Sequence, residues 1–352
     1  MAPNRRDFLS TALAAVGAGL LGPGRPAAAG AKRQGRTSMD EPSPQDAAAG
    51  GRAPGYVRLA RSGELEKREQ ALYAKLKACD LCPRGCGDNR IRGERGLCGA
   101  GMVPELASAG PHFGEEPPLV GRGGSGTVFL SRCNLLCVFC QNWEIAHLGR
   151  GRPVEPEALA QTMLALQRRG CHNINWVTPS HQLPGLLRAL RLAAASGLRI
   201  PLVYNTGGYD ALETLRLLDG VVDIYLPDFK YQDGEQAARY SAGAEDYPEK
   251  AAAAVAEMQR QVGTLDVDAR GVARRGLLIR HLVMPHGIAG SERFVRWVAS
   301  ELGTDTAVNI MGQYHPAHQA HAHPRIARPV NAEEVAAARR AAREAGLTNL
   351  ID

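Results

Sequence analysis

Two periods of hydrophobic residues alternate along the chain from Thr127 onward. Short apolar runs predict strands at residues 127–131, 173–178, 200–205, 221–226, 276–284 and 307–311. Longer segments with apolar residues every three or four positions predict helices at residues 155–169, 181–196, 209–218, 235–262, 291–302 and 332–345. Strands that alternate with helices indicate an α/β fold with a parallel sheet, helices outside it and chemistry at the carboxyl ends of the strands.

Composition and charge exclude two broad classes. The chain has 352 residues and is 44% hydrophobic, which excludes a disordered protein and allows one α/β barrel or two domains. The formal charge is +6, but residues 1–61 hold nine Lys and Arg against four Asp and Glu, which leaves the remainder nearly neutral. Only 5% of residues are aromatic. We therefore expect no nucleic-acid partner.

The first thirty residues have the order of an export signal. Arg5 and Arg6 precede a modestly apolar stretch, residues 11–21, and the small residues 27–29 follow as a cleavage site. The apolar stretch is too short to span a bilayer, which needs about 20 residues, and we expect no membrane span. Residues 1–30 are therefore interpreted as a twin-arginine signal peptide.

Residues 31–54 are rich in Gly, Ala, Pro, Arg and Ser, which predicts a flexible linker. If the signal is used, the protein is exported to a periplasmic or other extracytoplasmic location, and otherwise it is cytoplasmic. The alternative interpretations are a disordered Ala-rich leader, or translation that starts at Met39.

Cysteine spacing carries the strongest chemical signal. Seven of the eight cysteines fall into two groups with mostly two or three residues between neighbours, and such short loops favour chelation over disulfide bonds. Cys133, Cys137 and Cys140 occupy the loop after the strand at 127–131. Three thiolates can hold three irons of a [4Fe–4S] cluster and leave the fourth iron open for a ligand. A zinc or disulfide loop is the alternative.

The spacing C-x3-C-x2-C, with Phe139 before the last cysteine, resembles the signature of the radical S-adenosylmethionine (radical SAM) superfamily. The resemblance implies a partial (β/α)6, TIM-like barrel, to which the six predicted strands correspond. It also implies a [4Fe–4S] cluster whose open iron binds SAM, reductive cleavage of SAM to a 5′-deoxyadenosyl radical, and packing of Phe139 beside the adenine.

Polar residues at three predicted strand ends resemble motifs of the activating enzymes of glycyl radical enzymes, such as pyruvate formate-lyase activase. These residues are Asn205, Thr206, Asp228, Lys230 and the Tyr314-His315 pair. The resemblance places them around SAM, with a monovalent cation near Asp228, although Asn205 stands where activases often carry Asp. It implies a low-potential electron donor and a glycyl radical enzyme or another protein substrate as partners. A surface ion pair is the alternative for Asp228 and Lys230.

One strand end departs from the superfamily pattern. Many radical SAM proteins have Gly-Gly-Glu after the second strand, where backbone carbonyl oxygens bind the SAM amino group. Residues 177–181 read Val-Thr-Pro-Ser-His instead. Thr178, Ser180 and His181 are therefore the candidates for that contact.

The upstream group, Cys79, Cys82, Cys86 and Cys98, lies among Gly and Pro residues that let one loop turn several thiolates to a common centre. An auxiliary [4Fe–4S] cluster, a structural zinc ion and two disulfides all remain open. We expect a Cys-rich segment at residues 55–110 and the barrel at 111–352. Cys171 is expected to be an ordinary buried cysteine. The loop histidines His318, His321 and His323 are expected to face solvent or to be disordered, and a metal site is the alternative.

Two competing functions remain. An exported iron–sulfur electron carrier, or a metal-stabilised binding protein on the same barrel, would hold a cluster that does not bind SAM. A disulfide-bonded secreted protein would hold no metal. The sequence identifies neither the catalytic residue that acts on substrate nor the substrate.

Overall fold

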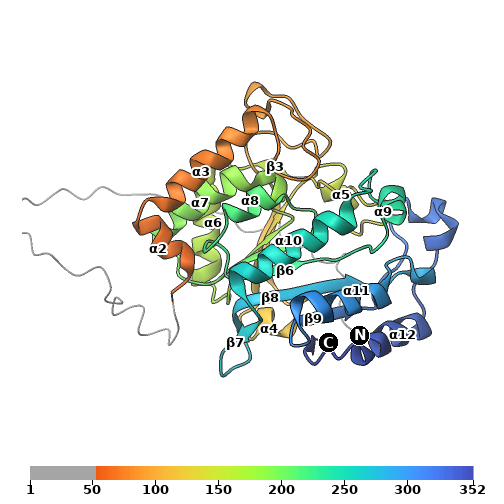
Figure 1. Ribbon diagram of the computed structural model, residues 1–352. Helices are drawn as coiled ribbons and strands as arrows, with labels where there is room; N and C mark the ends of the chain where they lie inside the picture. The colour runs from red at the N-terminus through yellow and green to blue at the C-terminus, as the bar shows by residue number, and fades with distance from the viewer. Residues whose placement is uncertain (1–52, 352) are drawn as a thin grey trace, which may run out of the picture. The chain divides into compact units, whose positions relative to one another are not determined.

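Six consecutive parallel strands form the centre of the structure, a computed structural model that describes residues 53–351 (Figure 1). Their order in the sheet follows the chain, and each pairs with the next. They are β2 (Ser125–Leu130), β4 (Ile174–Val177), β5 (Leu202–Thr206), β6 (Ile224–Pro227), β8 (Ala273–Leu282) and β9 (Ala307–Met311). The predicted α/β fold with a six-stranded parallel sheet is confirmed. The signal peptide call, residues 1–30, and the linker call, residues 31–54, apart from its last two residues, lie outside the described residues.

Four further strands extend the sheet and were absent from the sequence prediction. They are β1 (Glu105–His112), β3 (Arg152–Pro153), β7 (Asp266–Val267) and β10 (Leu350–Ile351). The first pairs antiparallel with β2, whereas β10 adds a parallel strand beside β9. Because β3 and β10 end the strand order, the sheet is an open, partial barrel.

Helices follow the strands and cover the outer face of the sheet (Figure 1). They include α6 (Pro156–Arg168), α7 (Leu183–Ala195), α8 (Leu212–Arg216), α11 (Ser291–Trp297) and α12 (Ala332–Glu344). In α6 the predicted apolar stripe, Leu159, Met163 and Leu166, is buried. One of these helices, α8, is shorter than predicted, with five residues. The helix predicted at residues 291–302 has those bounds, but its last turn, Val298–Leu302, is π-helical.

The prediction of one helix over residues 235–262 is wrong. The segment forms α9 (Gly234–Tyr240) and α10 (Tyr247–Val262), separated by a loop. The backbone leaves the helical region there because Ala242 and Gly243 adopt positive φ angles of 48° and 72°. Helix propensity alone favours a continuous helix through these Ala-rich residues, and tertiary contacts of the loop override it.

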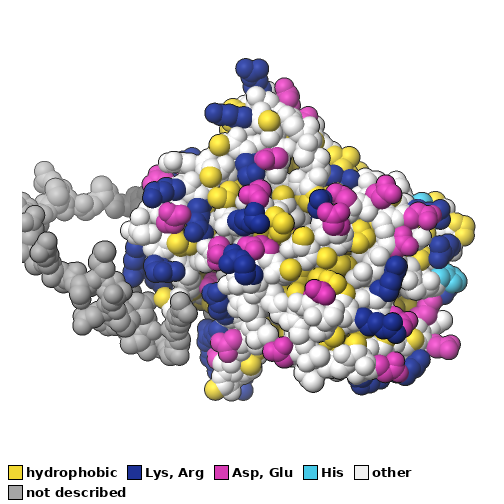
Figure 2. Space-filling model, in the orientation of Figure 1, with side chains coloured by type: hydrophobic (Ala, Val, Ile, Leu, Met, Phe, Trp, Pro, Cys, Tyr) yellow, Lys and Arg dark blue, Asp and Glu magenta, His cyan; other side chains and the backbone are white. Residues whose placement is uncertain are grey.

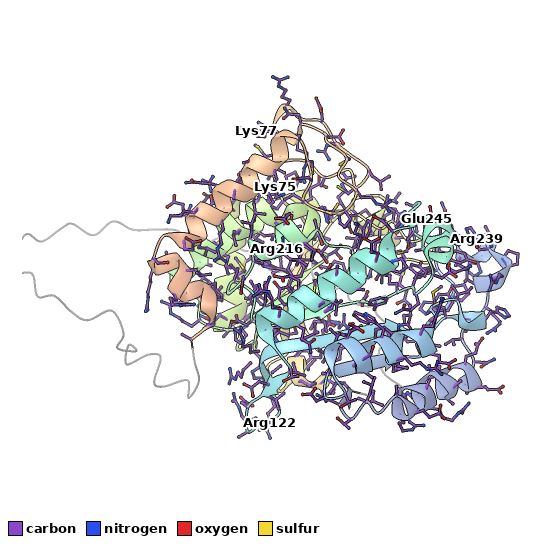
Figure 3. All side chains as sticks on the ribbon, viewed as in Figure 1. Lys75, Lys77, Arg122, Arg216, Arg239 and Glu245 are labelled. Carbon is purple, nitrogen blue, oxygen red and sulfur yellow. The ribbon has the colours of Figure 1, made fainter. Side chains whose placement is uncertain are left out.

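The segment before the barrel begins with two helices, α2 (Gly55–Arg61) and α3 (Glu64–Ala74), which pack against α7. Lys75 and Lys77 lie at the end of α3, where the Cys-rich loops begin (Figure 3). These loops contain one short 3-10 helix, Arg90–Arg92, and lead into β1. Residues 53–351 thus form a single compact unit.

Alternate residues of each strand face opposite sides of the sheet. One set joins the main core under the helices, as Tyr204, Tyr225 and Ile279 do. The other set forms a second apolar cluster inside the barrel, which includes Leu119, Val203, Ile224, Leu226, Leu278 and Ala307. Asn205, Asp228 and Arg280 lie two or four residues further along the same inner face, so they project into the barrel near its carboxyl end.

A short helix, α4 (Pro117–Val120), carries Leu119 into the inner cluster. No helix among residues 53–351 is long and apolar enough to cross a membrane. The face drawn in Figure 2 mixes Lys and Arg with Asp and Glu side chains.

Candidate functional site

The loop after β2, residues 131–142, carries Cys133, Cys137 and Cys140 and is here called the cluster loop. Two of its non-glycine residues adopt left-handed backbone conformations, Arg132 with φ 76° and Leu136 with φ 49°. Such conformations cost free energy and persist where the surrounding structure enforces them, often at functional sites. Here they turn the chain sharply on either side of the first thiol.

Each thiol of the cluster loop has a hydrogen-bonding neighbour. The backbone N–H of Leu135 donates to Cys133 Sγ at 3.4 Å, and the Ser241 hydroxyl lies 3.0 Å from Cys137 Sγ. The backbone of Asn142 bonds to the Cys140 thiol. Hydrogen bonds to a sulfur stabilise its thiolate form. Ser241 comes from the break between α9 and α10, which explains why that break matters to the site.

Burial raises the pKa of the Cys137 thiol to about 11 and that of Cys140 to about 12. Lys230 lowers both pKa values, since its charge favours the thiolates. Buried thiols of this kind become thiolates when a metal centre supplies the compensating charge. The donor set therefore fits a cationic metal centre.

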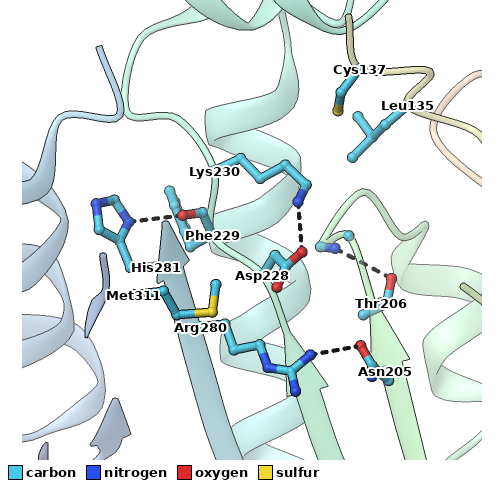
Figure 4. A network of polar contacts seen from close by, with 12 residues as sticks. Leu135, Cys137, Asn205, Thr206, Asp228, Phe229, Lys230, Arg280, His281 and Met311 are labelled. Atoms are coloured by element: carbon cyan, nitrogen blue, oxygen red, sulfur yellow. Dashed lines mark hydrogen bonds and ion pairs between the residues drawn. The ribbon is translucent and has the colours of Figure 1, made fainter. Parts of the chain in front are cut away.

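Asp228 and Lys230 form an ion pair of 2.6 Å beside the cluster loop. The pair is largely buried, with 24% of the Asp228 and 16% of the Lys230 side chain exposed, so it is not a solvated surface pair. Burial opposes the charge on Lys230, but the carboxylate of Asp228 and the thiol of Cys137 raise its pKa. Figure 4 shows Lys230 between Asp228 and the loop that carries Leu135 and Cys137.

Tyr247, the first residue of α10, fixes the backbone around this ion pair. Its hydroxyl accepts a hydrogen bond from the Lys230 N–H at 2.9 Å and contacts the carbonyl oxygens of Gly207 and Asp228 at 2.9 and 3.0 Å. A Cβ on Gly207 would lie 2.8 Å from Leu135 of the cluster loop, so the strand end and the loop touch. Sequence reasoning missed Tyr247 because it lies far from the motif it supports.

Asn205 and Thr206 end β5 in two separate networks. The Asn205 side-chain oxygen accepts from Arg280 Nη1 at 3.3 Å (Figure 4). The Thr206 hydroxyl donates to Asp210 Oδ2 at 2.7 Å, and Ser180 and Tyr204 donate to Asp210 Oδ1. Burial raises the pKa of Asp210. Asp210 was missed from the sequence, where its only signal is its place just after Asn-Thr-Gly-Gly-Tyr.

The three candidates for the missing Gly-Gly-Glu contact lie in different surroundings. Thr178 adopts φ 58°, a left-handed conformation that is rare for a β-branched residue, and its N–H donates to the Asn205 carbonyl at 2.8 Å. Ser180 joins the Asp210 network. His181 is buried with Nε2 2.9 Å from the Ser131 carbonyl oxygen, and burial lowers its pKa to about 4.

Phe139 and the segment after β9 pack together at the cluster loop. The Phe139 ring meets the Tyr314 ring edge-on with centroids 5.8 Å apart, and Gln141 Nε2 lies 3.3 Å from His315 Nδ1. The structure thus brings His315 to the residue next to Cys140.

The other loop histidines do not converge on one point. His318 stacks on Trp143 at 5.1 Å and His323 lies edge-on to Tyr240 at 5.5 Å, whereas His321 is exposed.

The upstream cysteines are free thiols. Cys79 and Cys82 are buried, Cys98 is half-buried and Cys86 is exposed, and the isolated Cys171 is buried. Among residues 53–351, no three Cys, His, Asp or Glu side chains converge closely enough to hold a single metal ion. The fit of the cluster loop to a [4Fe–4S] cluster therefore rests on its three thiols and their hydrogen bonds.

Residues 127–257, from β2 to within α10, match the family model described as the radical SAM superfamily. The chain is 31% identical over 287 residues to an uncharacterised protein of Methanocaldococcus jannaschii, and the match covers 79% of this chain and 78% of that protein. The chain therefore belongs to the radical SAM superfamily, which implies a [4Fe–4S] cluster and SAM as cofactors.

Among solved structures, the chain is similar to a radical SAM methyltransferase from Sphaerobacter thermophilus. The superposition covers 82% of this chain and 89% of the methyltransferase, with 14% identity and a TM-score of 0.42.

Proposed function

We propose that this protein is a SAM-cleaving radical enzyme of the type that activates glycyl radical enzymes. The observation that carries the proposal is the meeting of the cluster loop with the Asp228–Lys230 pair, where Lys230 lies within electrostatic reach of Cys137. His315 contacts Gln141, the residue after Cys140. These contacts support a SAM pocket framed by the activase-like motifs.

Cys133, Cys137 and Cys140 would hold the [4Fe–4S] cluster, leaving one iron for SAM. When bound and reduced by an external electron donor, the cluster would supply the one-electron reductive chemistry that cleaves SAM, with methionine and 5′-deoxyadenosine as the products to be measured.

The residues of this chain would orient SAM around the cluster. Tyr247 fixes the backbone of Asp228 and Lys230. The paired carboxylate and ammonium would therefore present fixed charges to the charged methionine end of SAM. Asn205 and Thr206 are held by Arg280 and Asp210, which limits their rotation. Phe139 supplies an aromatic face for adenine. A monovalent cation beside Asp228 is part of the same proposal.

The test uses the full chain reconstituted anaerobically with iron and sulfide. We expect 5′-deoxyadenosine after addition of dithionite and SAM, and at least a 100-fold loss in Cys137→Ala, as an order-of-magnitude expectation for a lost metal ligand. Cys171→Ala is the matched control, because it also removes a buried thiol and should keep the activity. Hydrogen transfer from a glycine-containing peptide or protein would then identify the substrate class.

One result would reject the proposal. If the cluster assembles and is reduced by dithionite but SAM stays intact, the chain is an iron–sulfur electron carrier on the same barrel.

The twin-arginine motif, Arg5-Arg6, further leads us to propose export of the folded holoprotein. Cell fractionation of the native chain against Arg5→Lys/Arg6→Lys tests that location separately.

A further inference from the structure

We infer that Cys79, Cys82, Cys86 and Cys98 hold a second iron–sulfur cluster, in direct contact with the cluster loop. This metal site does not depend on SAM cleavage, because it uses different residues. Its support comes from the folding of the upstream loops, a buried charge beside them and their contacts with the barrel.

The upstream loops are folded tightly around the four thiols. Left-handed turns at Gly85 and Gly87 let the chain reverse after Cys82 and after Cys86, and the Gly87 N–H returns to the Cys79 carbonyl at 3.0 Å. A Cβ on Gly96 would lie 2.4 Å from Cys86 Sγ, so the chain that leads to Cys98 crosses directly over Cys86. These contacts gather the loop segments that carry Cys79, Cys86 and Cys98 into one region of the chain.

A buried cation points to negative charge at this site. Arg90 is 3% exposed, and among residues 53–351 it forms no ion pair. Its Nη1 lies 3.7 Å from Cys79 Sγ, while Nε and Nη2 donate to the Gly101 carbonyl oxygen. An isolated buried charge is costly unless a counter-charge is near. Metal-bound thiolates at Cys79 and its neighbours would supply that counter-charge.

Contacts between the two cysteine loops favour iron over zinc. Asn134, which follows Cys133, donates a side-chain hydrogen bond to the Cys82 thiol. Arg84 donates to the Asn134 and Ser241 carbonyl oxygens at 2.8 and 2.9 Å, and the Ser241 hydroxyl touches Cys137. Zinc has no redox chemistry and gains nothing from this contact. An iron–sulfur cluster there would supply a one-electron centre next to the catalytic one.

The proposed upstream site lies between solvent and the cluster loop. Cys86 is exposed, whereas Arg84, two residues after Cys82, donates to the Asn134 carbonyl oxygen of the cluster loop. A Cβ on Gly99, next to Cys98, would lie 2.9 Å from Arg132 Nη1 of that loop. The proposed site therefore extends from solvent to the catalytic centre, as a route for electrons from a reduced low-potential donor requires.

The test compares iron content and electron paramagnetic resonance (EPR) spectra of full-length variants, reconstituted with iron, sulfide and zinc offered together. We expect about eight irons per chain in the wild type and about four in Cys133→Ala/Cys137→Ala/Cys140→Ala, for two and one [4Fe–4S] clusters. The remaining signal of the triple variant should not change when SAM is added. Retention of zinc without iron, or of no metal, in a folded triple variant would overturn the inference.

Cys86→Ala is the matched upstream variant, because the exposed thiol contributes little to packing. It should lower the iron content while the circular dichroism and the melting temperature of the apoprotein stay unchanged. Wild-type iron content and EPR spectra in Cys86→Ala would contradict four-cysteine ligation. If the triple variant holds iron but the wild type leaves SAM intact, only the proposed function fails.

Discussion

The imidazole Nδ1 of His281 lies 2.8 Å from the carbonyl oxygen of Phe229, the residue between Asp228 and Lys230 (Figure 4). Since a carbonyl oxygen only accepts, Nδ1–H donates and Nε2 accepts from the Ser291 hydroxyl at 2.9 Å. The ring also stacks on Phe294 with centroids 4.3 Å apart. His281 thus ties the Asp-x-Lys segment to β8 in its neutral form.

This contact predicts a pH-dependent stability. Burial lowers the pKa of His281 from 6.5 to about 4. Between pH 6.5 and 4, His281 is therefore protonated in the unfolded chain and neutral in the folded chain. The free energy of unfolding falls as pH drops through this range. His281→Asn keeps a donor for Phe229 but cannot titrate. Between pH 7 and 5 it should lose about 1–2 kcal/mol less stability than the wild type, measured by denaturant unfolding. Equal losses in the two proteins would exclude His281 as the cause.

Lys230→Met should weaken SAM cleavage about 10-fold. The substitution leaves the Asp228 carboxylate unpaired and removes the charge that faces Cys137, which costs on the order of 1–2 kcal/mol at a partly buried pair. Lys250→Met is the control, because its 3.2 Å pair with Glu249 is exposed. Rates of 5′-deoxyadenosine formation should separate the two variants. Equal rates would show that the Lys230 charge does not act on SAM.

Gly208→Ala should lower the free energy of unfolding by more than the strain of its left-handed backbone alone would. Gly208 has φ 81°, and a Cβ there would lie 2.3 Å from the Asp228 carbonyl oxygen. Gly170→Ala is matched for strain, since φ is 85° and no atom lies within 4 Å of its Cβ. We expect a loss of about 1 kcal/mol in Gly170→Ala and clearly more in Gly208→Ala, from thermal unfolding. Similar losses would mean that the strand end moves aside easily.

Thr178→Gly should stabilise the fold by about 1 kcal/mol, because it relieves a left-handed β-branched residue at the end of β4. His286→Gly is the strain control, with the same φ of 58° at an exposed position. If Thr178 contacts SAM, its variant alone should lose SAM cleavage while gaining stability. If the melting temperature of Thr178→Gly does not rise, the left-handed backbone of Thr178 does not destabilise the fold.

Features with a local cause could be predicted from the sequence. The six strands follow from short apolar runs, and the cluster loop follows from cysteine spacing after one of them. The end of the helix at Tyr240 had only a weak signal, Gly243 among alanines, because its cause is contact with the cluster loop. The Asp228–Lys230 pair was placed correctly at a strand end, but Tyr247, which fixes it, lies 17 residues from Lys230.

Long-range polar pairs had no signal in the sequence. Arg280 and Glu116 lie 164 residues apart and meet inside the barrel, where Glu116 accepts from Arg280 Nε at 2.7 Å. Glu115 also pairs with Arg280, and Asn309 donates to Glu116 at 2.9 Å. Neither glutamate follows a predicted strand, so strand-end reasoning could not find this network.

The buried Arg280 network should dominate the stability of the barrel interior. Arg280→Met would leave Glu115 and Glu116 buried without a counter-charge, and breaking such a pair costs about 3–5 kcal/mol. Arg274→Met is the control, because its partner Asp268 is shared with Arg270 near the surface and the expected loss is about 0–1 kcal/mol. Urea unfolding at pH 7 measures the loss in the free energy of unfolding for Arg280→Met and for Arg274→Met.

At acidic pH, the free energies of unfolding of Arg280→Met and the wild type should differ less than at pH 7. Burial alone would raise the pKa of Glu116, but the Arg280 guanidinium holds it below its usual 4.5. The wild type therefore loses this stabilisation only as pH falls below 4.5, whereas in Arg280→Met the carboxyls take up protons at higher pH and relieve the unpaired charge. Adding Glu115→Gln and Glu116→Gln to Arg280→Met should restore part of the stability at pH 7. Absence of rescue would mean that the cost comes from lost packing of the Arg280 side chain rather than from unpaired carboxylates.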